Sequence, residues 1–170
     1  MLFAAVLVVV TLVLDHFQIL DVGTGNATAK DGDSLALNGT DVRLHGIDAP
    51  EFNQSCGSPQ GDYLCGRVAA KALRNLLRGR TINCRSIETD RYGRAVSICQ
   101  DGGLEINREM VRLGWAVAYI RHSVGYVRAQ QEAKAAKRGI WQGRFEMPEN
   151  YRVRNRKSFG DAVSGGQIED

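Results

Sequence analysis

Acidic residues stand at both ends of one predicted β-hairpin. Residues 31–33 (Asp-Gly-Asp) come just before it, and residues 48–51 (Asp-Ala-Pro-Glu) come just after it. Because antiparallel pairing brings the two ends of a hairpin together, we expect four acids in one place. A cluster of carboxylates without His or Cys suits a hard cation such as Ca²⁺ or Mg²⁺. The two motifs therefore predict a site for a divalent cation.

Two arginines could add a phosphate clamp to this site. Arg43 lies in the second strand of the hairpin, and Arg94 follows a predicted turn at 90–93. Guanidinium groups bind phosphate oxygens in a bidentate manner. A cation and two arginines could neutralise the charge that develops during phosphodiester cleavage, while a carboxylate handles water. Strict strand alternation, however, places Arg43 on the face opposite Asp33, so a bulge would be needed to bring them together.

The hairpin that must position these residues has a clear signal. Alternating apolar residues at 34–37 and 41–44 flank Asn38-Gly39, a dipeptide typical of two-residue turns. This turn predicts that Leu37 pairs with Thr40, Leu35 with Val42, and Asp33 with Leu44.

Further along the chain the pattern alternates between strands and helices. We expect an incoming strand at 26–30, a loop at 52–66, an amphipathic helix from Arg67 to Gly79 and a second hairpin pairing 81–87 with 94–99. Two more helices are expected at 106–113 and 127–138. Short strands with an interrupting helix favour an α+β, mainly β fold: a small five-stranded OB-type barrel with three helices.

The composition fits one domain with short appendages. The chain has 170 residues, 44% hydrophobic and 24% charged, with a net charge of +3. These values exclude a disordered, collagen-like or polytopic membrane protein. We expect the domain at 23–143 and a polar, partly disordered tail at 144–170.

Residues 1–22 have the character of a signal peptide or an anchor. Residues 2–14 are apolar apart from Thr11, and as a helix they would span about 20 Å, short of the roughly 30 Å of a bilayer core. A buried N-terminal strand or helix is the alternative. The segment favours an extracytoplasmic protein, whether secreted, periplasmic or membrane-anchored.

Four cysteines support export. Cys56, Cys65, Cys84 and Cys99 contain no C-x-x-C pair, so zinc is disfavoured and two disulfides are expected. Of three possible connectivities the local one is favoured, because the second hairpin places Cys84 opposite Cys99 and leaves Cys56 to pair with Cys65. The alternative is four reduced cysteines in a cytosolic protein.

The motifs together resemble the staphylococcal nuclease (thermonuclease) family. The resemblance runs over about residues 26–143 and rests on segments 31–34, 43–51, 90–94, 107–116 and 139–141. It implies a five-stranded OB barrel with three helices. It also implies Ca²⁺-dependent hydrolysis of DNA and RNA at the P–O5′ bond, which leaves 3′-phosphates.

The resemblance assigns a metal site to the acidic cluster. By position, Asp33 and Asp48 would bind Ca²⁺ together with the backbone carbonyl of Ala49. Asp31 matches a nearby acid that supports this site.

The same resemblance assigns catalytic and substrate-binding roles. Glu51 would act as the general base or orient the attacking water. Arg43 and Arg94 would hold the phosphate and stabilise the transition state. Tyr92 matches a tyrosine that contacts the terminal phosphate, and Tyr119 matches one that borders the base.

Three features depart from the family pattern. Ser34 replaces the usual threonine, and Arg121 stands where the staphylococcal enzyme has a second tyrosine near the substrate. Arginine can stack on bases as tyrosine does. The loop at 52–66 holds two cysteines that the staphylococcal enzyme lacks, and it follows Glu51 directly, so it could alter substrate access.

Three hypotheses follow for the function. The first is a secreted or envelope-attached, metal-dependent nuclease that works as a monomer on DNA and RNA, with no obligate protein partner. The second is a non-catalytic OB module that binds nucleic acid or protein, and the third is a disulfide-stapled envelope protein with a relic site. The sequence favours the nuclease, because binding alone has no need for a Glu–Arg pair and all five residues of the site are present: Asp33, Arg43, Asp48, Glu51 and Arg94.

Overall fold

The computed structural model describes the backbone of residues 21–164 and the side chains of residues 22–156. The predicted signal or anchor segment, 1–22, lies outside the described residues except for its last two. None of the helices in the described range is long and apolar enough to cross a membrane.

The described strands form one large curved sheet and two small ribbons. The large sheet contains β1 (Asp21–Gly25), β2 (Ala27–Ala29), β3 (Ser34–Leu37), β4 (Thr40–Leu44), β8 (Ile82–Thr89), β9 (Ala95–Asp101) and β10 (Leu104–Glu105). Its order is β1-β8-β9-β4-β3-β2, and β10 pairs with β9. The ribbons join β5 (Ile47–Asp48) to β11 (Val117–Ala118), and β6 (Cys56–Ser58) to β7 (Gly61–Tyr63).

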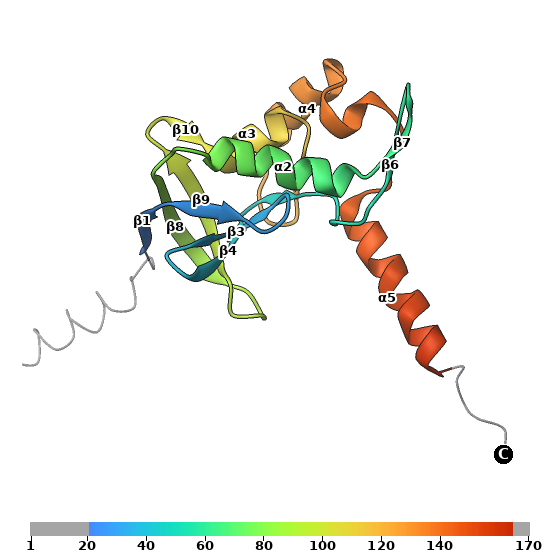
Figure 1. The fold of residues 1–170 in the computed structure, drawn as a ribbon, viewed down its shortest axis with the longest axis horizontal. Helices are drawn as coiled ribbons and strands as arrows, with labels where there is room; N and C mark the ends of the chain where they lie inside the picture. Colours follow the sequence, from blue (N-terminus) through green and yellow to red (C-terminus); the bar gives the residue numbers. More distant parts are fainter. Residues whose placement is uncertain (1–20, 165–170) are drawn as a thin grey trace, which may run out of the picture.

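Helices cover one side of this sheet (Figure 1). They are α2 (Cys65–Leu77), α3 (Ile106–Arg112) and α4 (Val127–Ala135), followed by a 3₁₀ helix, η1 (Gly139–Gln142). A further helix, α5 (Pro148–Ser164), extends away from the sheet and the other helices. The α+β, mainly β class is confirmed, although the described range has four α-helices where three were predicted.

The predicted hairpin register is confirmed. Leu37 lies opposite Thr40 and Leu35 opposite Val42, and the Leu44 amide donates to the Asp33 carbonyl at 2.8 Å. The alternating apolar side chains Leu35, Leu37, Val42 and Leu44 are buried together with residues of α2 and α3. Burying them against α2 and α3 holds the acidic end of the hairpin at a defined place.

Both predicted disulfides are present. Cys84 lies directly opposite Cys99 on β8 and β9 and is bonded to it, and Cys56 is bonded to Cys65. Two disulfides are typical of proteins that fold in an oxidising, extracytoplasmic environment.

Two segments differ from the sequence-based expectation. The predicted loop at 52–66 contains the short β6–β7 ribbon, and helix α2 begins at Cys65, two residues before the predicted start. In the expected tail at 144–170, Pro148–Ser164 form α5. Proline at a first helical position and Glu149 in the first turn both favour a helix start, but the helix lacks the apolar stripe by which a helix is recognised in a sequence.

Candidate active site

A sharp turn before β3 sets the position of the first acidic motif. The amides of Lys30 and Asp31 donate to the Ser34 carbonyl at 2.9 and 3.4 Å, and the Asp33 amide donates to Asp31 Oδ1 at 3.0 Å. Asp33 therefore lies outside β3, where strand alternation no longer applies. Its side chain reaches Arg43, and the two are 2.6 Å apart (Asp33 Oδ1 to Arg43 Nη1).

Glycine is required between the two acids of this turn. A Cβ at Gly32 would lie 2.6 Å from the Cβ of Ala49 and 2.8 Å from that of Ala69. These distances are too short for carbon atoms in contact. Gly32 thus lets the first acidic motif, the second acidic motif and α2 approach one another closely.

A chain of charged contacts joins the two motifs. The Ala49 amide donates to Asp33 Oδ2 at 2.7 Å, and Arg43 Nη2 donates to Asp48 Oδ1 at 2.9 Å. Asp33 and Asp48 are only 3% and 1% exposed. Arg43 thus bridges two buried carboxylates and is held in one orientation.

Burial shapes the charge state of this group. Desolvation is the largest cause that raises the pKa of Asp33 to about 8; Arg43 and the Ala49 amide act against it, and the neighbouring charges of Asp31 and Asp48 act with it. Burial lowers the pKa of Arg43, but Asp33 and Asp48 outweigh burial, so the pKa of Arg43 lies above its ordinary value. The site concentrates negative charge that a cation would stabilise.

Arg152, on α5, is a member of this cluster that the sequence did not reveal. Its Nη1 lies 2.8 Å from both Asp48 Oδ1 and Glu51 Oε1, and its Nη2 lies 2.9 Å from Asp48 Oδ2. These bonds to Asp48 and Glu51 raise the pKa of Arg152 against the lowering effect of burial. The only signal in the sequence was the helix-start pair at 148–149.

Gln54 is a second residue that sequence reasoning missed. It is fully buried, its Oε1 accepts from the Glu51 amide at 3.1 Å, and its Nε2 donates to the Glu146 carbonyl at 2.7 Å. Gln54 therefore ties the backbone at Glu51 to the segment that leads into α5.

Arg94 is held by its own turn. Asp90 Oδ2 accepts from Arg94 Nε at 2.8 Å and lies 2.7 Å from its Nη2, and the guanidinium lies 5.6 Å from the centre of the Tyr92 ring. These contacts place Arg94 and Tyr92 together on the β8–β9 turn. No direct contact is found between Arg94 and the Arg43 cluster in the described side chains.

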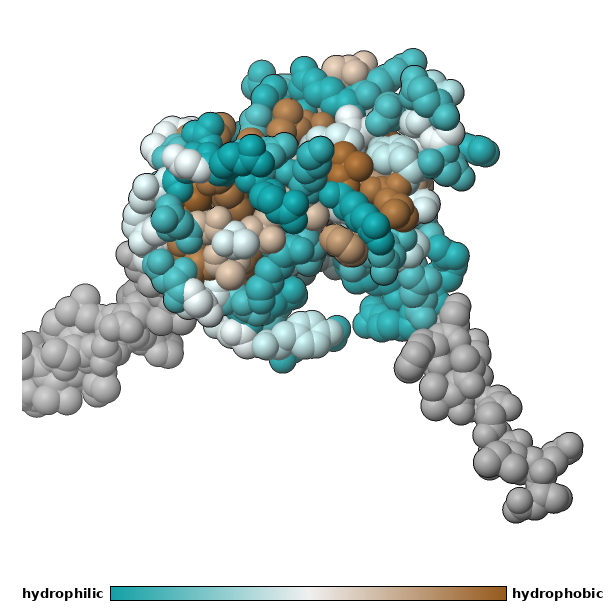
Figure 2. All heavy atoms as spheres, viewed as in Figure 1, coloured by the Kyte–Doolittle hydropathy of each residue, from teal (hydrophilic) through white to brown (hydrophobic). Residues whose placement is uncertain are grey.

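One cleft nevertheless brings most of the predicted residues together. Its volume is about 1220 Å³, and the predicted site residues in its lining are Asp31, Arg43, Glu51, Tyr92, Arg94 and Tyr119. Arg121 lines a neighbouring hollow instead and pairs with Glu149 at 3.1 Å. Figure 2 shows the cleft as a hollow between the sheet and α5, bordered by largely hydrophilic surface.

The donor chemistry fits a hard divalent cation. Asp33 and Asp48 offer buried carboxylate oxygens beside Asp31, without any soft ligand. Across the described residues, no three His, Cys, Asp or Glu side chains converge as a ready-made metal cluster. The guanidinium groups of Arg43 and Arg152 contact three of the four carboxylate oxygens of Asp33 and Asp48, and the Ala49 amide contacts the fourth.

Comparison with known proteins defines the class. The family described as "Staphylococcal nuclease homologue" matches residues 41–143, which is more than half of the chain. The chain therefore belongs to the staphylococcal nuclease family, and the resemblance seen in its motifs is confirmed.

Relatives in this family include proteins named as endonucleases. The chain is 39% identical over 126 residues to the succinoglycan biosynthesis protein ExoI of Rhizobium meliloti, covering 72% of this chain and 66% of that protein. It is 34% identical over 146 residues to the probable endonuclease LCL3 of Schizophyllum commune, covering 74% and 48%. An uncharacterized endonuclease of Escherichia coli is 32% identical over 125 residues, covering 69% and 76%. The chain thus spans less than two thirds of the first two of these relatives.

Proposed function

We propose that this protein is a calcium-dependent nuclease that hydrolyses DNA and RNA at the P–O5′ bond and leaves 3′-phosphates. One observation carries the proposal: Asp33, Arg43, Asp48 and Glu51 are joined through their own contacts or through Arg152 at the edge of a cleft that also holds Arg94. Membership of the family and the names of its endonuclease relatives support it.

The acidic cluster would hold the cation. Asp33 and Asp48 would bind Ca²⁺ with the backbone carbonyl of Ala49, and Asp31 would support the site. When bound, the cation would supply Lewis-acid stabilisation of charge on the phosphoryl group. Asp33 is anchored for this role, since the Ala49 amide already fixes one of its oxygens at 2.7 Å.

Glu51 would act as the general base that accepts a proton from the attacking water. Its side chain is 39% exposed, in contrast to the buried Asp33 and Asp48, so it can reach a water molecule in the cleft. A carboxylate in this position can accept a proton from water as the water oxygen bonds to phosphorus and the P–O5′ bond breaks. The departing 5′-oxygen then takes up a proton from solvent.

The two arginines would stabilise the transition state. Arg43 is oriented by Asp33 and Asp48, and Arg94 is oriented by Asp90, so both guanidinium groups are already positioned at the cleft before substrate binds. Tyr92 and Tyr119, in the same cleft, would border the nucleotide. Arg121 lines the neighbouring hollow, so it would contact only a part of the substrate that extends beyond the cleft.

The protein would act as a monomer outside the cytoplasm, without an obligate protein partner. The two disulfides support the location, and the finer choice between a secreted, periplasmic and anchored form rests on the character of residues 1–22.

Incubation with DNA and RNA tests the proposal directly. The purified protein should cleave both in Ca²⁺ and neither in EDTA, and the products should carry 3′-phosphates by mass spectrometry. Glu51→Gln, which is nearly isosteric, should retain nucleotide binding and lose most turnover. Undiminished cleavage in EDTA would exclude the metal role. Binding without cleavage in Ca²⁺ would favour the alternative, a non-catalytic OB module.

A further inference from the structure

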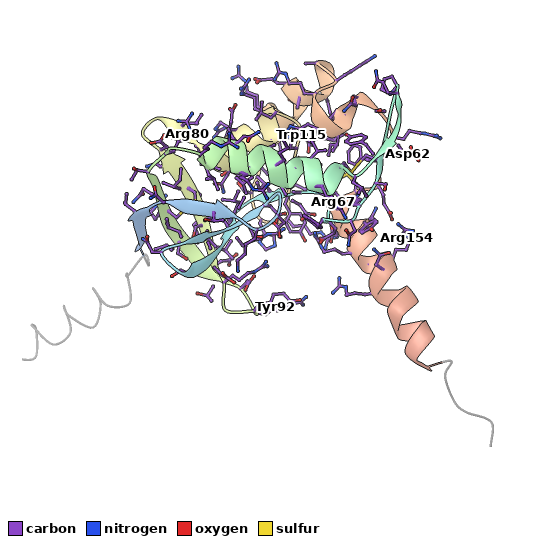
Figure 3. The ribbon with its side chains drawn as sticks, in the orientation of Figure 1. Asp62, Arg67, Arg80, Tyr92, Trp115 and Arg154 are labelled. Carbon is purple, nitrogen blue, oxygen red and sulfur yellow. A yellow bond between two sulfur atoms is a disulfide. The ribbon has the colours of Figure 1, made fainter. Side chains whose placement is uncertain are left out.

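Helix α5 forms a second wall of the cleft, facing the β8–β9 turn. Tyr151, Arg152, Asn155 and Arg156 line it from this side. Figure 3 places Tyr92 at the tip of the β8–β9 turn and Arg154 on α5, on opposite sides of the gap. The family match ends at residue 143, so this wall lies outside the part of the chain that the family describes.

Helix α5 lines the cleft with Glu149, Tyr151, Arg152, Val153, Asn155 and Arg156, and three of these share one helical face. Arg152, Asn155 and Arg156 are spaced i, i+3 and i+4, which puts them on the same face of a helix. Arg154 belongs to another face, because it pairs with Glu146 at 2.8 Å and lines the neighbouring hollow. The helix thus presents two arginines and an asparagine to the cleft on one face, beside Glu149 and Val153.

Specific contacts fix this wall at the catalytic end. Arg152 is bound to Asp48 and Glu51, and the Tyr151 hydroxyl donates to the Asn53 carbonyl at 3.4 Å. From Arg152, Arg156 lies one turn further along the helix, about 6 Å along its axis. Arg156 is exposed, and no ion pair to it is found among the described side chains.

The lining of both walls suits a polynucleotide with accessible bases. Arginines stand on both sides, and the tyrosines 92, 119 and 151 all line the cleft, with Tyr92 68% exposed. Exposed aromatic rings bind bases that are free to stack, as in a single strand, while arginines follow the backbone. The volume of about 1220 Å³ exceeds the roughly 300–1,000 Å³ of a pocket for one small molecule.

We propose that α5 supplies an additional phosphate-binding subsite, in which Asn155 and Arg156 contact the backbone of a single-stranded polynucleotide one helical turn beyond the catalytic carboxylates. This inference rests on the proposed nuclease function and extends it to residues outside the family match. Arg156 provides the charge at this subsite and Asn155 provides an uncharged hydrogen-bond donor.

Salt-dependent binding tests the subsite. The probe is a fluorescent single-stranded oligothymidylate of about 12 nucleotides, within the range that one OB fold covers. Its Kd is measured by anisotropy at several salt concentrations in Ca²⁺, with every variant carrying Glu51→Gln to suppress cleavage. Each phosphate contact contributes about 0.7 to the slope of log K against log salt for a single strand. Arg156→Ala should lower the slope by about that amount, and Arg156→Lys should retain it.

Arg154→Ala is the matched control, because it removes the same charge from the same helix outside the cleft. It should leave the slope unchanged, and a labelled dinucleotide should bind equally with and without Arg156. Any of three results would overturn the subsite. The slope could be equal for Arg156→Ala and its parent, it could fall equally in Arg154→Ala and Arg156→Ala, or the parent could fail to bind the probe. Cleavage of the same probe by the wild-type protein is read separately. If the wild-type protein cleaves the probe but the slope of Arg156→Ala is unchanged, only the subsite is refuted. If the slopes are as expected but the probe is not cleaved, only the nuclease proposal is refuted.

Discussion

Replacing Arg152 should strengthen cation binding to the acidic cluster. Arg152 bonds to both oxygens of Asp48 and to one of Glu51, and Arg43 also bonds to Asp48 Oδ1. A cation that uses Asp48 must therefore displace Arg152 or bind against its positive charge. Arg152→Gln removes this competitor and its charge while keeping a polar, shorter side chain.

The size of the effect follows from the contacts. Each hydrogen bond to a charged group contributes about 1.5–3 kcal/mol. Arg152 makes three such hydrogen bonds. Its side chain is 29% exposed and forms hydrogen bonds with water when it is displaced, so we count the free energy of about one bond as the net cost of displacing it. Since about 1.4 kcal/mol corresponds to a tenfold change in Kd, Ca²⁺ should bind roughly 10- to 100-fold more tightly in Arg152→Gln.

Isothermal titration calorimetry with Ca²⁺ alone measures this change without substrate or turnover. Arg154→Gln is the control, because Arg154 is bound to Glu146 and lies in the neighbouring hollow. Arg152→Lys should give a smaller gain, since it keeps the charge but loses the bidentate contact. Circular dichroism checks that each variant is folded. An unchanged or weaker Ca²⁺ affinity in folded Arg152→Gln would refute the competition.

Three further predictions concern the clamp, the buried amide and the disulfides. Arg43→Lys should lower kcat by about 10²–10³, nearly as much as Arg43→Ala, because an ammonium cannot bridge two partners in the same way; near-native turnover in steady-state assays would exclude the clamp. Gln54→Leu should lower the free energy of unfolding by about 1–3 kcal/mol in denaturant titrations, since it leaves the Glu51 amide and a carbonyl unpaired; an unchanged midpoint and slope would contradict this role. Replacing both cysteines of Cys84–Cys99, 15 residues apart, by alanine should cost about 3 kcal/mol of stability. Removal of Cys56–Cys65 should affect activity more, because it restrains the segment after Glu51; equal activity in both double variants would argue against that.

Local sequence signals determined much of the scaffold. The β3–β4 hairpin was predictable because Asn38-Gly39 favours a tight turn and period-two alternation then sets the register. The Cys84–Cys99 bond followed from the second hairpin, since opposed residues on paired strands come within bonding distance. The gathering of acids at one end of the first hairpin followed from the same antiparallel geometry.

Strand alternation failed where the strand itself ends. It placed Arg43 and Asp33 on opposite faces, but they are 2.6 Å apart because Asp33 belongs to the turn before β3. Where a strand stops depends on packing, here of Gly32 against Ala49 and Ala69, and a periodic pattern carries no information about that.

Only the tertiary structure brought α5 to the site. Arg152 and Asp48 are 104 residues apart, and their contact is a charged pair on a helix without an apolar stripe, so neither periodicity nor spacing indicates it. Gln54 is similar, because a single buried amide joins residues 51 and 146 through backbone atoms that every residue has. Charged and amide contacts of this kind form only when the fold places two distant segments next to each other. That position is set by the whole packed domain, including the Cys56–Cys65 bond and the β6–β7 ribbon, whose Gly57 amide donates to the Arg144 carbonyl ahead of α5.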